Sequence, residues 1–186
     1  MYKRQLYNIP INSSNGTTGV FGAVNITGIV KNLHIESSKV SITSKSKSTA
    51  EGTSILVGRN KGKILNCCVK ECQIAANPTK TNQSANTGGI AGTSTGEITN
   101  CYVTNTQIIY DANSKIKAGP AGGIAGSSQA QGLIANCYSA NNIIKNRESY
   151  NGGICGKASD GAHIENCYVY NLSLIHISEP TRLQLI

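Results

Sequence analysis

The stretch Gly89-Ile90-Ala91-Gly92, followed after a short link by Ile98-Thr99-Asn100-Cys101-Tyr102-Val103, decides the fold. Around Tyr102 the residues alternate, so Cys101 and Val103 share one face of a strand while Tyr102 takes the other. The apolar pieces are shorter than the roughly 10 to 12 residues of a typical helix and show no 3.6-residue periodicity. The pattern indicates short strands separated by tight bends.

The same pattern occurs five times along the chain. The segments 19–22, 55–58, 123–126 and 153–156 match 89–92, and an asparagine follows each of the five: Asn32, Asn66, Asn100, Asn136 and Asn166. The residue after that asparagine is Leu33, then Cys67, Cys101, Cys137 and Cys167. Successive asparagines are 34, 34, 36 and 30 residues apart. A unit of this length cannot close a core alone, whereas stacked copies can.

We therefore predict an all-β fold, a right-handed parallel β-helix (β-solenoid) of about five coils with three short strands each. One strand holds Gly-Ile-Ala-Gly, one follows the asparagine, and one centres on Val40, Ile74, Ile108 or Ile144. Each repeat position should form a column along the axis. Asparagine suits the bend because it tolerates the left-handed αL conformation, and its stacked amides can form a ladder. Glycine permits close backbone approach or positive φ.

Composition and charge argue against several classes of fold and partner. Aromatic residues make up 5% of the chain and tryptophan is absent, which argues against a globular core built on large rings. The net charge is +8, but the basic clusters 45–47 and 59–63 are short and lack interleaved aromatics, so no nucleic-acid partner is expected. No apolar run approaches the roughly 20 residues that cross a bilayer, so no membrane insertion is expected in this chain.

The two chain ends share a feature at the DNA level. One short DNA element, read on opposite strands, can encode both Tyr2–Gln5 and Leu172–Ile175, and it resembles the transposase end of a sequencing adapter. We expect residues 1–5 and 172–186 to derive from that adapter, leaving residues 6–171 as a β-solenoid fragment of a larger protein. Natural termini are the alternative.

Four of the seven cysteines occupy one repeat position and should form an interior column. Buried free thiols, disulfides between stacked neighbours and a metal site all remain open, and the column favours small apolar side chains. Cys67, Cys68 and Cys72 lack the paired spacing of a zinc site. No metal or cofactor is expected.

Few residues suggest catalysis. His34 and His163 have no base, nucleophile or ligand at a recognisable spacing. The carboxylates that could act as a catalytic acid–base pair lie in different repeats or at different repeat positions: Asp111, Asp160, Glu97 and Glu165. The chain is expected not to be an enzyme.

Two surfaces are candidates for binding. Tyr102, Tyr138 and Tyr168 should stack outside on consecutive coils, either as an aromatic strip that receives sugar rings or as a cover for the sheet. The long connections 41–54, 75–88, 109–122 and 145–152 leave the repeat at the same point and should cluster on one side.

Residues 89–103, 123–139 and 153–169 resemble the GLUG motif family, and the resemblance extends over about 19–171. Repeat two departs from it at Ile55, where glycine is expected, and repeat one at Leu33-His34, which replaces Cys-Tyr. The resemblance implies a bacterial cell-surface or secreted protein with a stalk-like or adhesive role.

The expected function is therefore a non-catalytic structural or adhesive repeat segment, extracellular or on the cell surface. The alternatives are a carbohydrate-binding module that uses the tyrosine column, and an accessory region of a secreted peptidase or glycan hydrolase. The expected partners are an extracellular glycan, a host or cell-surface protein, and neighbouring repeats of the parent protein.

Overall fold

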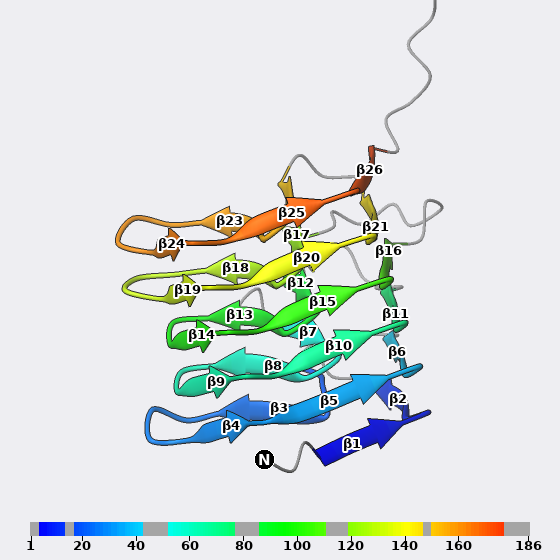
Figure 1. Cartoon of the computed structure of the whole chain (residues 1–186), viewed down its shortest axis with the longest axis horizontal. Helices are drawn as coiled ribbons and strands as arrows, with labels where there is room; N and C mark the ends of the chain where they lie inside the picture. The colour runs from blue at the N-terminus through cyan, green and yellow to red at the C-terminus, as the bar shows by residue number, and fades with distance from the viewer. Residues whose placement is uncertain are drawn as a thin grey trace, which may run out of the picture.

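A computed structural model describes residues 4–13, 17–42, 52–76, 86–110, 119–146 and 150–176. Over these residues the regular elements are all β-strands, and within each sheet the strands pair in parallel. Each strand pairs with its counterpart one turn away, so the chain climbs in stacked turns (Figure 1). The predicted β-solenoid is confirmed, while its right-handed winding stays a prediction.

Five sheets run along the solenoid, and we name them A to E. Sheet A contains β1 (Arg4–Tyr7), β5 (Leu33–Glu36), β10 (Cys68–Lys70), β15 (Tyr102–Thr104), β20 (Tyr138–Ala140) and β25 (Tyr168–Tyr170). Sheet B contains β2 (Pro10–Ser13), β6 (Lys39–Ile42), β11 (Gln73–Ala76), β16 (Gln107–Tyr110), β21 (Ile143–Asn146) and β26 (Ser173–His176).

The three remaining sheets have shorter or fewer strands. Sheet C contains β7 (Gly52–Ser54), β12 (Asn86–Gly88), β17 (Ala121–Gly122) and β22 (Asn151–Gly152). Sheet D contains β3 (Phe21–Val24), β8 (Val57–Asn60), β13 (Ala91–Ser94), β18 (Ala125–Ser128) and β23 (Cys155–Ala158). Sheet E contains β4 (Ile29–Lys31), β9 (Lys63–Leu65), β14 (Glu97–Thr99), β19 (Leu133–Ala135) and β24 (His163–Glu165).

Each complete turn has five strands, not the three predicted. Four turns, beginning at β7, β12, β17 and β22, carry all five, and a shorter turn (β3 to β6) and the pair β1–β2 precede them. The prediction missed two divisions. The Gly-Ile-Ala-Gly segment is not one strand, because a bend at Gly89-Ile90 separates β12 from β13. Ile98, two residues before the corner asparagine, belongs to a strand of its own, β14.

The core consists of apolar columns that repeat from turn to turn. Ile64, Ile98 and Ile134 in sheet E are fully buried, as are Val40, Ile74 and Ile144 in sheet B, and Ile108 is nearly so. Ile90 and Ile124 lie at the bends between sheets C and D and are also fully buried. Register is therefore fixed by burial, because a shift of one residue would move these side chains to the outside.

Close packing of sheets C and D explains the final glycine of repeats two to five. A Cβ on Gly92 would overlap the backbone of Gly52 and Thr53. Positive φ is not the reason at Gly92, because among the described glycines only Gly161 has a positive φ. Of the two roles predicted for these glycines, close backbone approach is the one required at Gly92.

Residues expected to derive from an adapter take part in two edge strands. Arg4 and Gln5 lie in β1, and β26 places Leu174 beside Ile144. A parallel edge accepts an extended chain through main-chain hydrogen bonds, which depend weakly on side-chain identity. The pairing therefore does not test whether the two ends derive from an adapter, and that origin stays a prediction.

Candidate functional site

Two corners of every turn are made by residues in the αL conformation. The first corner holds the predicted asparagines Asn32, Asn66, Asn100, Asn136 and Asn166, with φ between 51° and 57°. Of the expected amide ladder, one bond is formed among the described residues, from Asn66 Nδ2 to Asn32 Oδ1 at 3.3 Å. The φ angle is thus the more regular property of this column.

Sequence reasoning missed the second corner, between sheets A and B. It holds Asn8, Ser37, Glu71, Asn105, Asn141 and Asn171, again with positive φ. From Ser37 onward each lies five residues after a first-corner asparagine, and this constant spacing was the available signal. The spacing was hard to recognise because Ser37 and Glu71 replace asparagine in two of the turns.

The cysteine column has a polar role as well as an apolar one. The N–H groups of Cys67 and Cys101 each donate to the Sγ of the cysteine in the next turn, at 3.4 Å. Each thiol also lies within hydrogen-bonding distance of the carbonyl oxygen two residues earlier, as Cys101 Sγ does with Thr99 O at 3.3 Å. The cysteine side chain therefore satisfies backbone groups that the αL bend turns away from the sheet.

The second corner has an equivalent column built from different residues. Ser38, Cys72, Thr106 and Asn142 follow its αL residues. Cys72 N–H donates to Thr106 Oγ1 at 3.4 Å, and Thr106 N–H donates to Asn142 Oδ1 at 2.8 Å. Thr106 Oγ1 in turn donates to the carbonyl of Thr104 at 3.1 Å. A short side chain able both to accept and to donate a hydrogen bond is therefore the shared requirement.

The structure records all seven cysteines as free. Burial raises the pKa of the Cys72 thiol to about 11 and also raises the pKa of Cys155. No group of three or more His, Cys, Asp or Glu side chains in the described part of the chain could hold a metal ion.

The predicted tyrosine column is present on the outer face of sheet A, but it does not form a flat strip. The ring centroids of Tyr102 and Tyr138 are 4.8 Å apart with planes 5° from parallel, and those of Tyr138 and Tyr168 are 5.1 Å apart at 9°. Coplanar rings side by side could not approach so closely, so the rings are stacked on one another. Their faces cover one another, and mainly ring edges and hydroxyl groups meet solvent.

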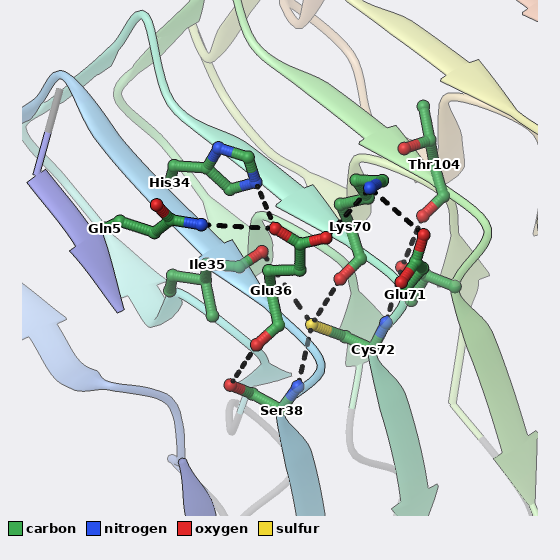
Figure 2. Close-up of polar contacts among 10 residues, drawn as sticks. Gln5, His34, Ile35, Glu36, Ser38, Lys70, Glu71, Cys72 and Thr104 are labelled. Atoms are coloured by element: carbon green, nitrogen blue, oxygen red, sulfur yellow. Dashed lines mark hydrogen bonds and ion pairs between the residues drawn. The ribbon is translucent and has the colours of Figure 1, made fainter. Parts of the chain in front are cut away.

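A polar cluster lies at the other end of the same face (Figure 2). Glu36 of β5 accepts a hydrogen bond from Lys70 at 2.8 Å and one from Gln5 at 3.2 Å, and His34 Nε2 is 3.5 Å from its carboxylate. Lys70 also pairs with Glu71 at 3.1 Å. The hydrogen bond from Lys70 lowers the pKa of Glu36, and Glu36 raises that of Lys70. The cluster links three consecutive strands of sheet A across their outer surface.

The remaining sequence candidates are scattered. Glu97 pairs with Lys63 at 2.9 Å, whereas His163 and Glu165 of β24 are exposed. Asp160 lies at the link between β23 and β24. Asp111, the basic cluster 45–47 and the middle of each long connection lie outside the described residues. The structure brings none of these described acidic residues together with a histidine into a cleft.

These features define a repeat protein of the parallel β-solenoid class. A model of the GLUG motif matches residues 83–109, as the sequence predicted. The match covers nearly all of the turn β12 to β16, so one GLUG motif corresponds here to one turn of the solenoid. No curated protein and no solved structure matches the chain. The described residues contain no helix long and apolar enough to cross a membrane.

Proposed function

We propose that this chain is a non-catalytic structural segment of a bacterial cell-surface or secreted protein, a rigid spacer that displays its long connections. The observation that carries the proposal is the reuse of equivalent positions. Corner residues, core isoleucines and stacked tyrosines have the same structural task in successive turns. Side chains committed in this way hold the scaffold together, and binding is left to what the connections carry.

An adhesive role with the expected host or cell-surface partner fits the same scaffold. Neighbouring repeats are a further proposed partner, because inward residues of the last turn such as Ile164 are 42% exposed, whereas Ile134 one turn earlier is fully buried. Stacking of another repeat would cover them.

Localisation and adhesion are tested separately. Antibodies against this chain should label intact cells of the source bacterium, and beads coated with the chain should adhere to target cells only if the segment is adhesive itself. Labelling without adhesion identifies a spacer. Labelling that requires permeabilised cells contradicts the proposal.

The carbohydrate-binding alternative rests on the tyrosine column. Stacking against sugar rings needs exposed aromatic faces, and among the three tyrosines Tyr168, at the end of the column, is 59% exposed. We expect no loss of glycan-array binding in a Tyr102→Ala/Tyr138→Ala double variant. A loss would favour a carbohydrate-binding module over a spacer. The other alternative is that the chain is an accessory region of a secreted peptidase or glycan hydrolase. That role depends on which domains accompany the chain in the parent protein.

A further inference from the structure

A basic recess lies beside the first two links that join sheet D to sheet E, because the second link is shorter than the first. The link between β3 and β4 is residues 25–28, whereas the link between β8 and β9 is only residues 61–62. The longer link extends farther from the solenoid than the shorter one (Figure 1). A recess of about 190 Å³ lies in this region, lined by Ala23, Val24, Asn25, Arg59 and Lys61.

The two cations in the recess have no anionic partner in the described part of the chain. The four ion pairs found there involve other residues, and the lining includes no carboxylate. Arg59 Nε is buried without a hydrogen-bond acceptor. A buried donor left unpaired costs free energy, so the protein itself leaves the hydrogen-bonding capacity of this guanidinium group partly unused.

The fold does not require cations at these two positions. In register with Arg59, three other turns have Ala23, Thr93 and Ser127, and the last turn has Lys157. The residues that follow strands of sheet D at the position of Lys61 are Asn25, Thr95, Gln129 and Ser159. The turn that begins at β7 thus combines an arginine and a lysine where small or polar residues suffice for folding.

We propose that this recess binds one oxyanion group, a carboxylate or sulfate carried by an acidic polysaccharide. The guanidinium group of Arg59 offers paired donors that match the oxygens of such a group, and Lys61 adds a second charge at the rim. The site is independent of the tyrosine column, which lies on sheet A, and goes beyond the spacer role.

The test is calorimetric titration at fixed ionic strength with an oligogalacturonate, a sulfated heparin disaccharide and inorganic sulfate. At least one probe should bind with a stoichiometry of one, and Arg59→Gln and Lys61→Gln should each weaken binding about tenfold or more. The carboxylate and sulfate probes identify the source of the oxyanion. Binding of inorganic sulfate alone would contradict a polysaccharide ligand.

Lys145→Gln is the matched control, because it removes the same charge on sheet B, away from the recess. Equal weakening in this variant would show non-specific attraction to a basic protein and overturn the site, as would the absence of binding by every probe. Lys61 is exposed on a link, so Lys61→Gln decides the question if Arg59→Gln does not fold.

Discussion

At the scale of single residues, the corners show why cysteine recurs in this repeat. The αL residue bends the chain from one sheet to the next, and the side chain that follows pairs with backbone groups of two turns. Cysteine does this while still filling the core. Ser38 and Thr106 show that a hydroxyl group serves the same purpose at the second corner.

Substitution of Cys101 separates the polar role from the apolar one. Cys101→Val keeps a compact apolar side chain but removes the acceptor for Cys67 N–H, so we expect a loss of about 1–3 kcal/mol in unfolding free energy. Cys101→Ser keeps an acceptor and should cost less. Urea denaturation measures the free energy, and hydrogen exchange of the Cys67 amide measures the bond itself. Equal stability of the two variants would mean that packing alone selects cysteine.

Stability should fall as the pH rises from about 9 to about 11. Burial raises the folded-state pKa of Cys72 to about 11 from the ordinary thiol value of 9.0, so in this window the unfolded thiol loses its proton while the folded thiol keeps it. Ionisation then favours the unfolded state. The measurement is the thermal midpoint against pH. Cys72→Ser should remove part of the slope, and an unchanged slope would contradict this assignment.

At the scale of the elements, the spacing of glycine predicts which sheets come into close contact. Gly92→Ala places a methyl group against the backbone of Gly52 and Thr53, so sheets C and D must separate locally. We expect destabilisation of about 1–3 kcal/mol or more.

Gly22→Ala is the control, since Gly22 is the corresponding glycine of the first repeat and a Cβ there would meet only Thr17 O at 3.9 Å. The measurement is the urea midpoint of both variants. Similar midpoints would show that the sheets tolerate the separation.

The sequence predicted the columns well and the strand boundaries poorly. Burial fixes which residues coincide from turn to turn, so the period of about 34 residues and the identity of Asn100 and Cys101 as column members follow from repetition alone. Strand ends depend on bends such as Gly89-Ile90, where glycine is compatible with either a strand or a turn. The recess at Arg59 depends on unequal link lengths. The sequence shows the inequality, since Asn32 lies ten residues after Gly22 and Asn66 eight after Gly58, but not the cavity that results. The stacking of the tyrosine rings required side-chain geometry.

At the scale of the whole molecule, the solenoid resembles a one-dimensional stack in which each turn contacts its neighbours. Central turns are covered on both sides, whereas the last turn is covered on one. Val103 and Ile144 are fully buried, while Val169 and Leu174 at the equivalent inward positions of the last turn are 41% and 40% exposed. Stability in such a stack is close to a sum of turn and interface contributions, so opening should begin where an interface is missing.

Hydrogen exchange should therefore show a gradient along the solenoid axis. We expect amides of the edge strands at both ends, β1 to β4 and β23 to β26, to exchange fastest and those of β12 to β16 slowest, because opening an end turn breaks one interface and opening a central turn breaks two. Mass spectrometry of peptic peptides, each covering about one turn, measures this directly. Uniform exchange in all turns would indicate a single cooperative unit, in which the loss of any one interface unfolds the whole stack.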